Sequence, residues 1–176
     1  KDGEQEFELY VTTPQNSFSR TGKPMVQVLT EGTPEELLKA NSRLNRYGKT
    51  LEEFFKKKPF SDDIRFKRDN DGLVPVGEGE SKLKALGESL TKKLSNYITI
   101  PKGYEYVFIP TEELLEGSRM YQLSLTNGTN TIPLAKVTNG TMTDSTKAQV
   151  IKNLFLDNNN FRYENNQPFA KWQVNY

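Results

Sequence analysis

The segment between residues 104 and 137 carries the strongest β-strand pattern of the chain. Apolar side chains recur at every second position over 104–109 and again over 118–126, which is the pattern of strands with one buried face. Asn127-Gly128 then supplies two residues that adopt the positive φ angles of a tight hairpin turn. We therefore predict an antiparallel meander, against which the helices pack, of strands 104–109, 118–126 and 131–137.

The borders of this predicted sheet follow from proline and from the end of the chain. Pro133 has no N–H group to donate, so its strand is predicted to lie at an edge or to contain a bulge. A final strand, 168–176, is predicted to complete the sheet. Between the first two strands of the meander, residues 111–116 are predicted to form a short helical turn that ends at Gly117.

The N-terminal part of the chain has a second, weaker β pattern. Residues 1–12 alternate between apolar and polar side chains, turn residues fill 13–24, and Met25–Leu29 is a short apolar run. We predict that the alternating segment and the apolar run are the two strands of an N-terminal β-hairpin.

Two helix starts follow this hairpin in close succession. Thr33 can cap a helix, and Glu36 three residues later completes a capping box. This helix is predicted to end at Gly48, a residue that suits a left-handed C-cap. A second helix is predicted to begin at Thr50 and to stop before Pro59.

Two more helices carry apolar stripes. Leucines recur at three- and four-residue steps over Ser81–Tyr97, which predicts an amphipathic helix. Asp144 is predicted to cap a last helix over Ser145–Asp157.

These elements predict the α+β class. The predicted architecture is an antiparallel sheet, made of the meander around residues 104–137 plus the C-terminal strand, packed against amphipathic helices, with an N-terminal β-hairpin. The length of 176 residues suits one domain over 1–176. The alternative is a division into a hairpin with a helical pair, 1–58, and a helix-plus-sheet body, 80–176.

Two absent residue types narrow the chemistry. The chain has 0 Cys and 0 His, which removes thiolate nucleophiles, disulfides, the commonest general base and the commonest transition-metal ligand. An enzyme would have to use carboxylates, Lys, Tyr or Ser, so a carboxylate-dependent hydrolase is kept only as an alternative. The adjacent Glu112 and Glu113 are not a catalytic pair, because neighbouring side chains diverge.

The segment 59–80 is predicted to be irregular, and loops of this length are usually functional or mobile. It contains an incomplete calcium-binding pattern. With Gly72 at the sixth position of an EF-hand loop, Glu78 falls at the twelfth, but Lys67 stands where the first carboxylate belongs. We predict no metal site and no cofactor.

Two groups of residues are candidates for binding. Basic residues gather around the start of the irregular segment, where they could contact anionic groups, and aromatic residues near the C-terminus could stack on a sugar or a peptide. The predicted binding residues are Lys56, Lys57, Lys58, Arg65, Lys67, Arg68, Phe161, Tyr163 and Trp172.

These features together favour a binding protein. The net charge of +1 gives no overall attraction to nucleic acid, so a protein or cell-wall partner is expected. The chain begins at Lys1, and we expect a removed leader or N-terminal anchor, with the anchor as the sole membrane contact.

We predict a non-catalytic extracytoplasmic binding or assembly domain of a bacterial surface protein or lipoprotein. The alternative is an NTF2-like or cystatin-like scaffold subunit of a secretion or conjugation machine, because helices that precede a meander suit that architecture.

Overall fold

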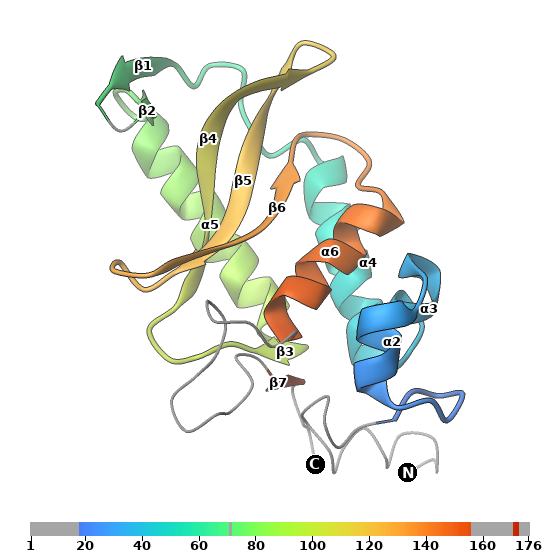
Figure 1. Ribbon diagram of the computed structural model, residues 1–176. Coiled ribbons are helices and arrows are strands. Elements are labelled where there is room, and N and C mark those ends of the chain that lie inside the picture. The colour runs from blue at the N-terminus through green and yellow to red at the C-terminus, as the bar shows by residue number, and fades with distance from the viewer. Residues whose placement is uncertain (1–17, 71, 156–170, 173–176) are drawn as a thin grey trace.

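The computed structural model of the chain describes residues 18–70, 72–155 and the backbone of 171–172. The helices are α2 (Met25–Glu31), α3 (Pro34–Leu38), α4 (Ser42–Lys56), α5 (Gly79–Leu94) and α6 (Asp144–Phe155). The strands are β1 (Phe66–Asp69), β2 (Gly72–Pro75), β3 (Ile98–Thr99), β4 (Glu105–Leu115), β5 (Ser118–Thr126), β6 (Thr131–Val137) and β7 (Lys171–Trp172). The predicted α+β class is confirmed: antiparallel strands pack against helices (Figure 1).

The central sheet is the predicted meander, with strand order β4-β5-β6. Phe108 of β4 lies opposite Leu123 of β5, so both side chains point into the core. The bounds of β5 and β6 are those predicted, and the turn between them holds Gly128 at a φ of 95°. Asn127 closes this turn, because its Oδ1 accepts hydrogen bonds from the backbone N–H groups two and three residues ahead, at 2.9 and 2.7 Å.

The first hairpin of the meander is longer than predicted. Residues 111–116 were expected to form a helical turn, but β4 continues to Leu115 in spite of a shift of register after Pro110. The Thr111 hydroxyl secures the shifted part by donating to the Met120 carbonyl at 2.8 Å. The prediction was wrong because pairing with β5 overrides the local helical preference.

Helix α5 covers the outer edge of β4. The Thr91 hydroxyl accepts a hydrogen bond from the Tyr106 N–H at 2.9 Å and donates to the Gly87 carbonyl at 2.7 Å. The helix can approach this closely because residue 87 is a glycine. A Cβ at this position would lie 2.5 Å from the Tyr106 carbonyl oxygen. The edge of β4 is therefore occupied by a helix, and a partner strand cannot add to it there.

The opposite edge, on β6, is protected in another way. Pro133 has no N–H group, and the ladder is irregular beside it, so both predictions for this residue are confirmed within the described chain. The Asn153 side chain of α6 donates to the Leu134 carbonyl at 2.7 Å. The C-terminal strand does not complete this sheet as predicted, because β7 pairs with β3 in a separate two-stranded sheet.

The N-terminal hairpin prediction was wrong in its second strand. Met25–Leu29 lies in helix α2, whose buried residues are Met25, Val28 and Leu29. Residues at steps of three and four lie on one face of a helix, and the short run allowed either interpretation. The predicted strand 1–12 lies outside the described residues.

The helical pair also differs from prediction in its boundaries. The Thr33 cap is confirmed, since its side chain accepts from the Glu36 N–H at 3.1 Å. However, α3 ends at Leu38 and α4 begins after Asn41, which caps it. Gly48 is interior to α4 and does not end a helix: a Cβ there would lie 2.9 Å from the Leu38 side chain, so glycine allows α3 to pack closely.

Helices α5 and α6 follow their predicted apolar stripes. Helix α5 buries Leu83, Leu90 and Leu94. In α6 the cap is one residue earlier than predicted, because the Thr143 hydroxyl accepts from the Thr146 N–H at 3.2 Å. The buried residues of α6 include Ala148, Ile151, Leu154 and Phe155.

The segment 59–80 is more ordered than predicted. It contains the antiparallel hairpin β1-β2, and Ile64, with 8% of its surface exposed, tethers it to the core. The buried residues of the described chain form one hydrophobic cluster. The cluster includes a buried pair, Tyr47 and Tyr106, whose hydroxyls lie 2.9 Å apart. In the ranges that the structure describes, no helix has the length and apolarity needed to cross a membrane.

Candidate functional site

A cleft of about 200 Å³ lies between the tip of the β4-β5 hairpin and the segment that connects α4 to β1. We call it the tip cleft. Its walls come from three parts of the chain that are distant in sequence, which is why sequence patterns do not reveal it. The lining residues are Phe60, Ser61, Asp62, Ile64, Phe66, Leu114, Gly117, Ser118, Arg119, Tyr121, Thr138 and Asn139.

The floor of the tip cleft is held by Asn139. Its Oδ1 accepts from the Phe60 N–H at 2.9 Å, and its Nδ2 donates to the Phe60 carbonyl at 2.8 Å. The Phe60 ring in turn stacks on the ring of Tyr121, with centroids 4.0 Å apart. A single side chain thus fixes the connecting segment against the sheet.

Arg119 and Tyr121 of β5 face the cleft from alternate positions of the strand. The Arg119 guanidinium lies 4.7 Å from the centroid of the Phe66 ring and donates one N–H to the Thr111 carbonyl at 2.7 Å. These two contacts orient the guanidinium and leave some of its five N–H donors for other partners.

The Tyr121 hydroxyl has no hydrogen-bond partner among the described residues, although Tyr121 is only 3% exposed. No fully buried polar side-chain atom in the described chain lacks a partner, so this hydroxyl reaches the open space of the cleft. Burial raises the pKa of Tyr121, and the nearby positive charge of Arg119 opposes that shift. The hydroxyl therefore stays protonated at neutral pH and can donate a hydrogen bond.

Two adjacent glutamates brace the hairpin from opposite sides. Glu112 makes two hydrogen bonds with Arg68 of β1, and Glu113 pairs with Lys136 of β6 at 2.6 Å. Their side chains diverge, as predicted. The hydrogen bonds from Arg68, followed by its charge, lower the pKa of Glu112. Both ion pairs are exposed, so they orient the hairpin and contribute little to the stability of the fold.

Beyond these braces the hairpin ends in an apolar tip. Leu114 and Leu115 are 57% and 52% exposed. The turn that follows places Glu116 at a φ of 52° and Gly117 at 85°, which is a two-residue turn with both residues in the left-handed region. We call Leu114, Leu115 and Glu116 the hairpin tip.

The structure separates the residues predicted to bind. Lys56 ends α4 and the next two lysines follow it, all exposed, whereas Arg65 and Lys67 flank or lie in β1. Figure 1 shows the end of α4 and the β1-β2 hairpin on opposite sides of β4 and β5, so these cations do not form one patch. Arg68 is bound to Glu112.

The aromatic part of the prediction is not tested. Phe161 and Tyr163 lie outside the described residues, and of Trp172 only the backbone, in β7, is described. Sequence reasoning missed the hairpin tip, although it had a signal: Leu114-Leu115 places two apolar residues side by side where the alternation of the strand should have given one.

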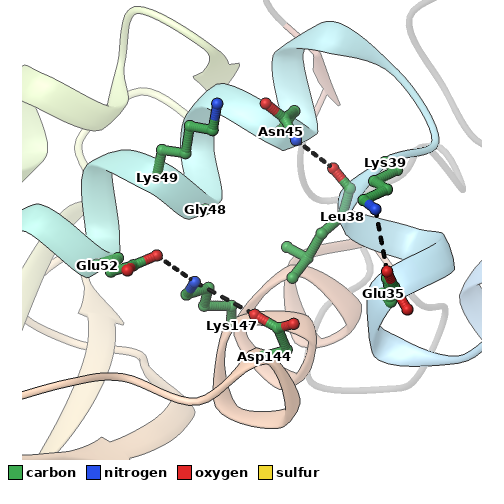
Figure 2. A pocket seen from close by; sticks show the side chains of 9 residues that line it. All are labelled: Glu35, Leu38, Lys39, Asn45, Gly48, Lys49, Glu52, Asp144 and Lys147. Carbon is green, nitrogen blue, oxygen red and sulfur yellow. Dashed lines mark hydrogen bonds and ion pairs between the residues drawn. The ribbon is translucent and has the colours of Figure 1, made fainter.

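A second pocket, of about 280 Å³, lies between α3, α4 and α6 (Figure 2). The Lys147 ammonium, on a side chain that is 8% exposed, lies 2.6 Å from Glu52 and 3.3 Å from Asp144. At the rim, Lys39 pairs with Glu35. Most of the charged groups in this pocket therefore satisfy one another, and we interpret them as ties between the three helices.

A wider groove of about 520 Å³ runs between β6 and α6. Among the described residues that line it, the only charged one is Lys136, which is already paired with Glu113. The described part of the chain also contains no group of three or more side chains that could hold a metal ion. Of these three pockets in the described chain, the tip cleft is the one in which oriented polar groups remain available.

Searches of protein-family models, of curated proteins and of solved structures found no match to this chain. Its function has to be inferred from the residues themselves.

Proposed function

We propose that this protein is a non-catalytic binding domain that docks a partner protein through the hairpin tip. The observation that supports this proposal is the exposure of two adjacent leucines, Leu114 and Leu115, each more than half accessible, at the end of a braced hairpin. Scattered exposed apolar residues are normal, but a contiguous exposed pair beside a cleft favours an interaction site.

The partner is expected to bind through side chains and not by adding a strand. Helix α5 occupies the edge of β4 through Thr91, and Pro133 with Asn153 protects the edge of β6. Strand addition needs a row of free N–H and C=O groups, which these contacts interrupt. The hairpin tip has no such protection.

A protein suits the hairpin tip better than a membrane does. Glu116 occupies the turn itself, between the leucines and Gly117, and would have to enter the lipid with them. Burying an unpaired carboxylate in lipid costs several kcal/mol, on the order of what two leucines gain. A protein partner can instead place a cation beside Glu116.

The extracytoplasmic location, the lipoprotein or surface anchor and the scaffold alternative remain predictions. The first two are tested by the gene that encodes this chain: a start codon directly before Lys1 with no leader would contradict them. The scaffold alternative requires assembly, and a protein that stays monomeric across a wide concentration range in sedimentation would contradict it.

Docking at the hairpin tip is tested with a photo-crosslinking amino acid at Leu115. The matched control carries the same amino acid at Lys92, an exposed position near the C-terminal end of α5. In an extract of the source organism, the Leu115 probe should give one protein adduct of defined mass, which excess unlabelled protein should suppress. The same adducts from both positions, or none from Leu115, would contradict the proposal.

A further inference from the structure

We propose that the tip cleft binds a carboxylate group attached to an apolar body, such as the C-terminal residue of a partner protein. This inference rests on the proposed function, which it deepens by naming the chemistry of the group that enters the cleft. Three features of the cleft carry it: the donors Arg119 and Tyr121, the apolar side chains beside them, and the presence of one cation among the described lining residues.

The donors are Arg119 and Tyr121, which face the cleft from the same side of β5. Arg119 is held by the Phe66 ring and by one hydrogen bond to Thr111, so its position is set before a ligand arrives. Tyr121 is 3% exposed, and its hydroxyl, which is unpartnered among the described residues, reaches the open space of the cleft and can donate to a ligand there. A carboxylate is acceptor-only and can satisfy both groups.

The wall also contains apolar side chains, next to the polar groups of Ser61, Ser118 and Thr138. Phe60, Ile64, Phe66 and Leu114 line the cleft beside the two donors. The volume of about 200 Å³ is smaller than a typical drug-sized pocket and suits one side chain. The ligand that fits is therefore a carboxylate with a short aliphatic or aromatic body.

The charges favour a monoanion over a phosphate group. Among the described residues of the lining, Arg119 is the only cation, and Asp62 adds an exposed carboxylate at the rim. The nearest alternative cation on the β1-β2 side, Arg68, is already bound to Glu112. A dianion would meet one unpaired cation and one like charge, whereas a single carboxylate can take two parallel hydrogen bonds from the guanidinium.

The test is an NMR titration of the full chain with four small probes. N-acetyl-leucine represents a C-terminal residue, and 4-methylpentanoate represents a free acid with the same body. The two matching amides keep the shape and remove the charge. Both acids should give saturable shifts at the Arg119 side-chain N–H and at the backbone of Phe66, and the amides should give none. Tighter binding of N-acetyl-leucine indicates a chain terminus as the natural ligand, and tighter binding of 4-methylpentanoate indicates a free acid.

Variants separate the cleft from general effects. Y121F keeps the stack on Phe60 and should weaken binding about tenfold, the effect of one hydrogen bond to a charged group. R119Q should weaken binding by at least that factor. Because R119Q also removes a contact to Phe66, R119K is added: it keeps the charge but loses the planar fork, and it too should bind more weakly. The matched control, Y97F, lies outside the cleft lining and should bind as the unaltered protein does.

The outcomes distinguish this inference from the proposed function. Amides that bind as tightly as the acids, or an unchanged affinity in Y121F and R119Q, would overturn the carboxylate inference. If the acids fail to bind but the Leu115 probe captures a protein, the carboxylate inference is wrong and the binding domain stands. If the acids bind but no protein is captured, the cleft serves a small acid and the protein-docking function is wrong.

Discussion

The substitution of Asn139 by alanine tests whether one side chain holds the tip cleft together. Asn139 makes two hydrogen bonds with the backbone of Phe60, a residue that is only 5% exposed. The matched control is N127A. Each of the two residues begins an Asn-Gly-Thr triplet, and each side chain makes hydrogen bonds with two backbone groups. The bonds of Asn127, however, close an exposed local turn.

The expected losses differ because water replaces the lost bonds at only one of the two sites. In N139A the Phe60 N–H and carbonyl lose their partners at a partly buried site, and each unsatisfied group costs about 1–3 kcal/mol, so we expect a loss of about 3 kcal/mol. In N127A the freed N–H groups reach solvent, and we expect a loss of about 1 kcal/mol or less.

The assay is urea unfolding followed by circular dichroism, with thermal melts in parallel. A loss of about 3 kcal/mol should lower the Tm of a chain of this length by roughly 6–12 °C, several times the effect of N127A. N139A should also weaken carboxylate binding, because the Phe60 ring no longer has a fixed place against Tyr121. Equal losses in the two variants, or a loss in N139A below about 1 kcal/mol, would refute the claim that Asn139 clamps the cleft.

Three further changes test other contacts of this fold. G87A should destabilise the protein by about 2 kcal/mol because the added Cβ meets the backbone of β4, although alanine favours helices. The control S89A, on the exposed side of the same helix, should be neutral or slightly stabilising. A G87A variant more stable than the unaltered protein would contradict the close approach of α5 to β4. Glu112 should titrate below its ordinary pKa by NMR, so its ion pair with Arg68 stabilises the fold above the unfolded pKa, and this contribution is lost as pH falls through the folded pKa. R68Q should raise the pKa of Glu112, with the charge of Arg119 still lowering it, and a pKa unchanged by R68Q would argue against the pair. E116G should stabilise the protein by about 1 kcal/mol in urea unfolding, because glycine adopts the positive φ of this turn without a Cβ penalty. A loss of stability would mean that Glu116 is not strained there.

Local sequence patterns determined much of the fold. The limits of β5 and β6, the edge position of Pro133, the Thr33 cap and the apolar stripes of α5 and α6 were all predictable. Each of these depends on residues within a few positions of one another: a side-chain period, a cap that bonds to its own turn, or a residue that lacks a donor.

Elements that depend on distant contacts were not predictable. The short apolar run Met25–Leu29 is compatible with either a strand or a helix, and packing against the core selects the helix. Gly48 had the local signature of a helix end, but the approach of α3 to α4 gave it an interior position. Strand β7 was recognisable as extended, whereas its pairing with β3 depends on where distant parts of the chain meet.

The candidate site belongs almost wholly to the tertiary structure. The sequence by itself directed attention to clustered lysines and arginines, which the fold then separated or paired with carboxylates. The tip cleft exists because Asn139 holds Phe60 against Tyr121. Asn139 and Phe60 are 79 positions apart in the sequence. A sequence determines periodicity and caps through neighbours, but which distant side chains share a cleft is decided by the packing energy of the whole core, which no local window contains.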